Sequence, residues 1–83
     1  MTELEQKVCD AFAKVAELED GRTITLETLK EDLGMTSLDI FELLMDLEDI
    51  FGIALEVERF SPCERVGDVC NEIEKQLADR QAQ

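Results

Sequence analysis

A serine stands at the start of a helix-forming segment, where its hydroxyl could carry a covalently attached group. Ser37 follows the turn-forming Gly34 and precedes an amphipathic run with regularly spaced acidic residues. On the first turn of a helix, backbone N–H groups lack intrahelical partners and the macrodipole is positive, which favours a bound phosphate. The chain contains no histidine that could activate Ser37 as a nucleophile. The sequence therefore indicates an attachment point rather than an active site, and we expect no catalytic residues.

The helix that must position Ser37 is expected to run from Thr36 to about Phe51. Thr36 is a favourable N-cap residue, and Asp39, three positions later, can complete a capping box. Gly52 is a natural stop for this helix because glycine readily adopts the left-handed conformation.

Four acidic residues of this helix, Asp39, Glu42, Asp46 and Asp49, form a stripe along one side. At about 100° per residue they fall within an arc of roughly 80°, and the stripe contains no lysine or arginine, so no i,i+4 pairing relieves their repulsion. The apolar arc spans roughly 240°, wider than a core-facing stripe, so Leu38 and Met45 beside the acids should stay exposed. A merely solvated face is the alternative, but acids beside exposed apolar side chains favour a docking surface. The expected partner-binding residues are Leu38, Asp39, Glu42, Met45, Asp46 and Asp49.

Two further segments show apolar residues at helical spacing. One extends from Glu3 to about Leu18 and ends at the turn-forming pair Asp20-Gly21. The other starts near Asp68, which we expect to be its N-cap, and frays over residues 78–83. The residues expected to face inward are Leu4, Val8, Ala11, Phe12 and Val15 in the first helix, and Val69, Ile73 and Leu77 in the last.

Two connections join these three helices. In residues 22–35 the run Thr25-Leu26-Glu27-Thr28 resembles a capping box, so we expect a short helix before Gly34. Pro62 excludes a long helix from residues 53–66 but leaves room for a helical turn around residues 58–61. We therefore predict an all-α fold: a small four-helix bundle with three main helices, a short third helix and a long first loop. Residues 1–83 should form one domain whose core contains Leu, Ile, Val and the four Phe residues.

Composition narrows the choice of partners and compartment. The net charge of −13, from 21 acidic and 8 basic residues, argues against nucleic acid and anionic membranes and favours partners with basic patches. The N-terminus lacks a signal peptide pattern, and no apolar run reaches the length of a membrane span, so we expect no membrane insertion. An odd number of cysteines points to a reducing compartment, the cytoplasm.

The cysteines do not suggest a metal site. Cys9, Cys63 and Cys70 have neither metal-ligand spacing nor histidine partners. We expect Cys9 and Cys70 to be core or boundary side chains and Cys63 to be a loop thiol.

The residues around Ser37 resemble the acyl carrier protein family. The resemblance rests on Gly34-Met35-Thr36-Ser37-Leu38-Asp39 and on the acidic helix that continues through Glu42-Leu43-Leu44-Met45-Asp46-Leu47-Glu48-Asp49-Ile50-Phe51-Gly52. The family's pattern is Asp-Ser-Leu at the head of an acidic recognition helix. Helix order, the long first loop and the acidic balance extend the likeness over most of the chain.

The resemblance implies a function for Ser37. In this family the matching serine carries a phosphopantetheine arm, whose thiol holds acyl intermediates as thioesters. The expected partners are a phosphopantetheinyl transferase and the acyl-transferring and chain-modifying enzymes of fatty acid, polyketide or specialised lipid biosynthesis. The carrier itself would be a non-catalytic, monomeric phosphoprotein.

The chain departs from the family pattern in two places. Thr36 replaces the usual aspartate, which bears on the choice of transferase, and residues 59–65 are longer and more basic than the usual connection. Both departures suggest a carrier dedicated to a specialised pathway. Two alternatives remain: an aminoacyl or peptidyl carrier, and an unmodified acidic adaptor with a carrier-like fold.

Overall fold

The computed structural model describes residues 1–16 and 24–81. Three α-helices, α1 (Glu3–Ala16), α2 (Ser37–Phe51) and α3 (Val66–Gln81), alternate with two 3-10 helices, η1 (Lys30–Leu33) and η2 (Val57–Phe60). The expected all-α fold is confirmed, and the short third helix is the single 3-10 turn η2. The expected extension of the first helix to Leu18 and the turn at Asp20-Gly21 lie outside the described residues.

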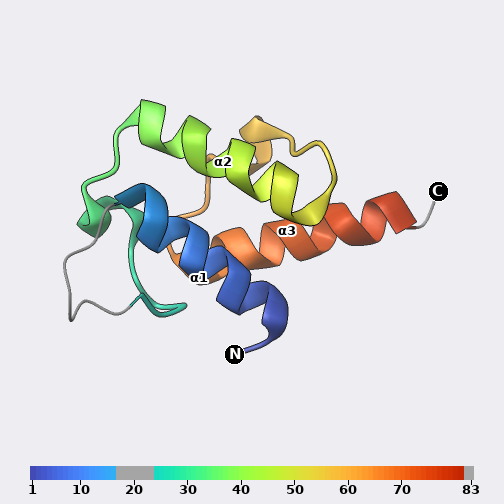
Figure 1. The fold of residues 1–83 in the computed structure, drawn as a ribbon, viewed down its shortest axis with the longest axis horizontal. Coiled ribbons are helices and arrows are strands. Elements are labelled where there is room, and N and C mark those ends of the chain that lie inside the picture. Colours follow the sequence, from blue (N-terminus) through green and yellow to red (C-terminus); the bar gives the residue numbers. More distant parts are fainter. Residues whose placement is uncertain (17–23, 82–83) are drawn as a thin grey trace.

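The three α-helices enclose one core, and the last turns of α3 project beyond the other two helices (Figure 1). α1 packs against both α2 and α3, which makes it the central element of the bundle. The residues expected to face inward from α1 and α3 do so: each is buried or packs against the core as a partly buried side chain. No helix in residues 1–16 and 24–81 is both long and apolar enough to cross a membrane.

The expectation that all four phenylalanines belong to the core was wrong about one of them. Phe12 and Phe60 are buried and Phe51 packs against the core, but Phe41 is exposed on the outer face of α2. At about 100° per residue, Phe41 points about 120° away from the fully buried Leu47, so it lies off the core-facing side of α2. The buried residues on that side are Leu43, Leu44 and Leu47.

The helix α3 begins earlier in the chain than expected. The helix begins at Val66, two residues before Asp68, so Asp68 is not its N-cap. Its Oδ2 atom instead accepts hydrogen bonds from the backbone N–H groups of Arg65 (3.0 Å) and Glu64 (3.2 Å). These hydrogen bonds from the backbone hold the pKa of the Asp68 carboxyl below its usual value.

The long first loop is fastened to the start of α3. Backbone hydrogen bonds join Lys30 N–H to the Glu64 carbonyl (2.8 Å) and Val66 N–H to the Thr28 carbonyl (2.9 Å). Gly67 N–H donates to the Leu26 carbonyl (2.9 Å). Two N–H groups in the first turn of α3 thus find acceptors in the loop, which brings the loop backbone against the helix. The segment with the capping-box pattern, residues 25–28, forms a turn, and the short helix before Gly34 is η1.

The backbone of Leu26 lies so close to position 67 that only glycine fits there without a shift. A substitution at this position should therefore destabilise the fold. A Cβ atom at Gly67 would lie 2.9 Å from the Leu26 carbonyl oxygen, a backbone atom that cannot move aside cheaply. Alanine normally stabilises a helix relative to glycine. We expect Gly67→Ala instead to lower the free energy of unfolding by about 1–3 kcal/mol, measured by urea denaturation. Asn71→Ala, at an exposed position of the same helix, is the control and should be neutral or stabilising; equal effects of both would contradict the predicted clash.

A second prediction follows from the depressed pKa of Asp68. A carboxyl group with a lower pKa in the folded chain adds stability above its unfolded pKa, and this stability is lost as the pH falls through the folded pKa. Asp68→Asn should therefore be less stable than the wild type near neutral pH, and the gap in urea midpoint should close from about pH 5 to about pH 3. Glu74→Gln, which removes one carboxylate at an exposed position of α3, is the matched control for the loss of a charge. A gap at Asp68 that stays constant with pH would show that the carboxylate does not stabilise the helix start.

Candidate functional site

The start of α2 is held by the expected capping box. Thr36 Oγ1 accepts a hydrogen bond from Asp39 N–H (3.2 Å), and Asp39 Oδ2 accepts one from Thr36 N–H (3.0 Å). The turn before it uses Gly34 in the left-handed conformation, with φ 65°. At the other end Gly52 is also left-handed, with φ 69°, and its N–H donates to the Glu48 carbonyl (2.8 Å). Both ends of the helix are therefore fixed as the sequence predicts.

Ser37 is the first residue of α2, and its side chain is exposed. The capping box satisfies Asp39 N–H, and Ile40 N–H donates to the Thr36 carbonyl (3.0 Å). Among the described residues, the N–H groups of Ser37 and Leu38 have no hydrogen-bond partner. A phosphate on the Ser37 hydroxyl would thus lie beside two free N–H donors at the positive end of the helix dipole. The residues present fit a phosphodiester at this position.

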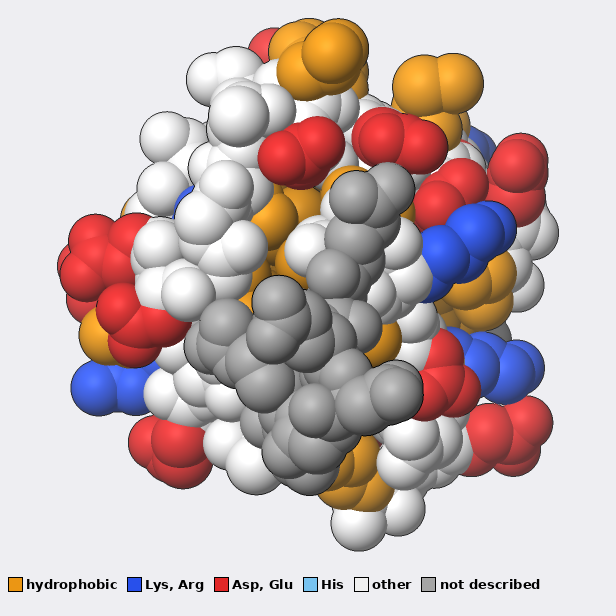
Figure 2. Space-filling view, turned by 60° about the vertical axis from the view of Figure 1, so that its left-hand side comes forward, with side chains coloured by type: hydrophobic (Ala, Val, Ile, Leu, Met, Phe, Trp, Pro, Cys, Tyr) orange, Lys and Arg blue, Asp and Glu red, His pale blue; other side chains and the backbone are white. Residues whose placement is uncertain are grey.

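The outer face of α2 carries a row of exposed apolar side chains. Leu38 is 75% exposed and Met45 is 63% exposed, as the helix geometry predicts. Phe41, 56% exposed, lies between them in the sequence and was missed, because every phenylalanine was assigned to the core. Figure 2 shows apolar side chains at the upper edge of the molecule, where α2 runs in Figure 1, with acidic side chains beside them.

The acidic residues of α2 are not equivalent in the folded chain. The Asp39 carboxylate is engaged in the capping box. Asp46 lies within 4.0 Å of the Lys14 ammonium group on α1, so a cation from another helix relieves part of the repulsion that no residue of α2 relieves. A cation from another helix cannot be seen in the sequence of α2 alone. Glu42 and Asp49 are exposed and form no ion pair within the described part of the chain.

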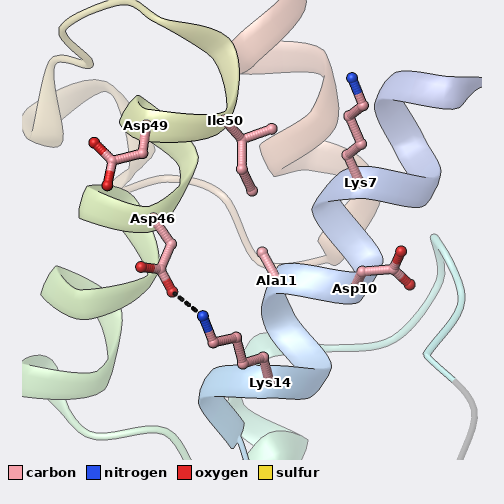
Figure 3. Close-up of a pocket in the computed structure, with 7 residues that line it drawn as sticks. All are labelled: Lys7, Asp10, Ala11, Lys14, Asp46, Asp49 and Ile50. Carbon is pink, nitrogen blue, oxygen red and sulfur yellow. Dashed lines mark ion pairs between the residues drawn. The ribbon is translucent and has the colours of Figure 1, made fainter.

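The contact between Lys14 and Asp46 crosses an open groove between α1 and α2. In Figure 3, Ile50 and Ala11 point toward each other across this groove, whereas the Asp49 carboxylate points away from α1. The groove has a volume of about 470 Å³. Asp46 is about 14 Å from Ser37 along the helix axis, at about 1.5 Å per residue, so the groove is separate from the attachment position.

The cysteines do not add reactive groups to this site. All three are buried and free, and Cys63 lies in a loop, as expected. Burial raises the pKa of Cys70 to about 12 and also raises the pKa values of Cys9 and Cys63. The described residues contain no group of three or more potential ligands that could hold a metal ion.

Comparisons with known proteins place the chain in a class. The family model of the phosphopantetheine attachment site matches residues 6–73. The chain thus belongs to the proteins whose helical domain carries covalently bound phosphopantetheine, and Ser37 lies within the matched region.

Similar proteins identify the family within this class. An acyl carrier protein of Exiguobacterium sibiricum is 41% identical over 76 residues, which cover 88% of this chain and 96% of that protein. One of Amoebophilus asiaticus is 32% identical over 80 residues, covering 96% and 100% of the two chains. A solved structure described as an acyl carrier protein from Mycobacterium tuberculosis matches with a TM-score of 0.76 and 28% identity, covering 88% of this chain and 97% of that one. The chain belongs to the acyl carrier protein family, and a role in fatty acid biosynthesis fits these relatives.

Because Glu42 and Asp49 are the acids of the α2 stripe without an ion pair or capping contact among the described residues, reversing their charge tests whether α2 attracts partner enzymes. Replacing Glu42 and Asp49 together by Lys should slow modification by a phosphopantetheinyl transferase about tenfold or more at low ionic strength, because electrostatic steering is lost. The difference should shrink at high salt, where screening already weakens steering. The control, Glu58→Lys with Glu74→Lys, changes the net charge equally at exposed positions outside α2. If both double variants react at the same rate, only net charge matters and the α2 face has no special role.

Proposed function

We propose that Ser37 carries the phosphopantetheine group of this acyl carrier protein. The observation that carries the proposal is the exposed Ser37 side chain on the first turn of a doubly capped helix, beside two N–H groups without partners. When bound, the group supplies a terminal thiol that holds acyl intermediates as thioesters. The free N–H groups of Ser37 and Leu38 would hold the phosphate end of the group at the helix start.

The chain presents the thioester, and catalysis belongs to its partner enzymes. The sequence has no histidine to act as a base, and the three thiols are buried with raised pKa values, so the described residues offer no activated thiol nucleophile. Its own residues have three tasks: to hold the phosphate end of the arm, to keep the helix start rigid, and to bring partners to α2.

The docking face of α2 serves the third task. Glu42 and Asp49 offer exposed carboxylates to a basic partner. Asp46 lies at the side of α2 that faces α1, where it pairs with Lys14. Leu38 and Met45 add exposed apolar contact area. Asp39 contributes mainly by holding the helix start through its capping hydrogen bonds. Electrostatic attraction raises the association rate without a large buried interface, which suits a carrier that must leave each enzyme quickly.

We further propose that residues 1–83 act as one monomeric carrier domain in the cytoplasm. Support comes from the single core shared by α1, α2 and α3, and from the three free cysteines, which suit a reducing compartment. The partners are a phosphopantetheinyl transferase and enzymes that load, modify or unload the acyl group.

The attachment is tested by intact mass spectrometry. Incubation with coenzyme A and a promiscuous phosphopantetheinyl transferase should add one phosphopantetheine to the wild type and none to Ser37→Ala. The far-ultraviolet circular dichroism of Ser37→Ala should match the wild type, because the exposed Ser37 hydroxyl makes no hydrogen bond in the described structure. An unmodified wild type after trials with several transferases would favour an unmodified adaptor, and modification of Ser37→Ala would move the site elsewhere.

A further inference from the structure

The connection between α2 and α3, residues 52–65, covers one side of the core with few buried side chains of its own. Leu55, Phe60 and Cys63 are buried, and its other side chains are exposed or half-buried. Its helical turn η2 packs mainly against α3. Because little apolar surface is buried here, the closure of this connection depends on other contacts. We call residues 52–65 the strap.

Arg59, on η2, joins the strap to α3 through ion pairs. Its Nε atom lies 2.8 Å from a carboxylate oxygen of Glu72, and its Nη1 atom lies 3.3 Å from one of Asp79; both acids belong to α3. Nη1 also lies 3.5 Å from a carboxylate oxygen of Glu56 within the strap. The Glu72 side chain is only 14% exposed, so loss of the guanidinium would leave a poorly hydrated carboxylate without its cation. The Arg59 side chain therefore stabilises the closed position of the strap.

A buried glutamine of α3 adds to this network. Gln76 is 5% exposed, and its Oε1 atom accepts a hydrogen bond from Glu56 N–H (3.0 Å). Its Nε2 atom donates to the Glu72 carboxylate (3.3 Å). Lifting the strap from α3 breaks the first of these hydrogen bonds together with the ion pairs of Arg59. The contacts that close the strap on α3 are thus largely polar.

Salt acts on the strap and on the bundle in opposite directions. In a chain with a net charge of −13, screening by dissolved ions reduces the repulsion among acids and favours the compact bundle. Around Arg59 the interaction is an attraction between one cation and several acids, so screening weakens it. The side chains of Glu56 and Asp79 are 68% and 66% exposed, which leaves their pairs with Arg59 open to dissolved ions. Higher ionic strength should therefore loosen the strap while it stabilises the bundle.

We propose that the strap is a conformational device that opens without unfolding of the three α-helices, and that Arg59 sets how often it opens in response to ionic strength. When the ion pairs of Arg59 break, η2 lifts from α3 and the buried side chains of the strap, Cys63 among them, reach water. Residues 59–65 are more basic than the usual connection of the family, and Arg59 is the residue of this segment that pairs with α3.

The thiol of Cys63 reports the opening directly. Iodoacetamide alkylates a buried thiol only while it is exposed, and peptide mapping separates Cys63 on the strap from Cys70 inside α3. A local opening exposes a buried group more often than global unfolding does. In the native wild type, Cys63 should therefore react about tenfold or more faster than Cys70. Equal rates would mean that the strap opens only with the whole bundle, and would overturn the proposal.

Variants at Arg59 test whether its ion pairs control the opening. Arg59→Gln should speed the alkylation of Cys63 about tenfold, and Arg59→Lys should speed it less, because an ammonium group keeps the charge but cannot span the same carboxylates. Lys75→Gln is the control of equal charge: Lys75 is exposed on α3 and forms no ion pair within the described residues. If Arg59→Gln and Lys75→Gln alkylate at Cys63 at the same rate, Arg59 does not close the strap.

A core substitution separates the strap from the bundle. Val8 is fully buried on α1, away from the strap in sequence, so Val8→Ala should destabilise the bundle whether the strap is open or closed. The alkylation of Cys70 should become faster in Val8→Ala, whereas that of Cys63 should stay as in the wild type. Equal acceleration of both thiols would contradict a separate opening of the strap.

Salt supplies the last test. Raising the ionic strength should speed the alkylation of Cys63 in the wild type about twofold or more and slow that of Cys70. In Arg59→Gln the acceleration at Cys63 should be absent. Slower alkylation of Cys63 at high salt in the wild type would overturn the proposal. The result does not depend on the attachment at Ser37, because the thiol of an attached group is mapped on the peptide that contains Ser37.

Discussion

Each of the three α-helices begins with a carboxylate in its third position that accepts a hydrogen bond from the backbone just before the helix. Glu5 accepts from Thr2 N–H at 2.7 Å, Asp39 from Thr36 N–H at 3.0 Å, and Asp68 from Arg65 N–H at 3.0 Å. A chain with a net charge of −13 thereby places acids where the positive ends of helix dipoles stabilise them. The bundle, and with it the position of the first residue of α2, depends on these helix starts.

The capping of α2 also shapes the chemistry at its first residue. The capping box uses the N–H of Asp39 and leaves those of Ser37 and Leu38 free among the described residues. The helix start is therefore rigid and still able to receive a phosphate. Further along α2, neighbouring segments decide what remains free: Lys14 engages Asp46, and Glu48 accepts a hydrogen bond from Leu55 N–H (2.8 Å). Phe41 and Met45 in the middle of the helix stay exposed.

Much of the fold and of the candidate site could be predicted because the relevant interactions are local. Apolar residues at helical spacing indicated all three α-helices, and glycines in the left-handed conformation end the turns at Gly34 and Gly52. The capping box joins residues only three positions apart, so its pattern is visible in the sequence. The exposed position of Ser37 follows directly from this box, since a residue placed just after the N-cap lies on the first turn of the helix.

The sequence by itself determined where the helices lie, how α2 starts and which of its residues border the acids, because backbone hydrogen bonds and side-chain periodicity act over a few residues. Only the tertiary structure decided that Phe41 faces outward and that Cys63 is buried in its loop. The same is true of the contact between Gly67 and the Leu26 carbonyl oxygen, which leaves no space for a Cβ atom. The tertiary structure also decided that Lys14 reaches Asp46. These features depend on which segments distant in sequence pack together, and a helix with a wide apolar arc satisfies its local pattern whichever part of that arc is buried.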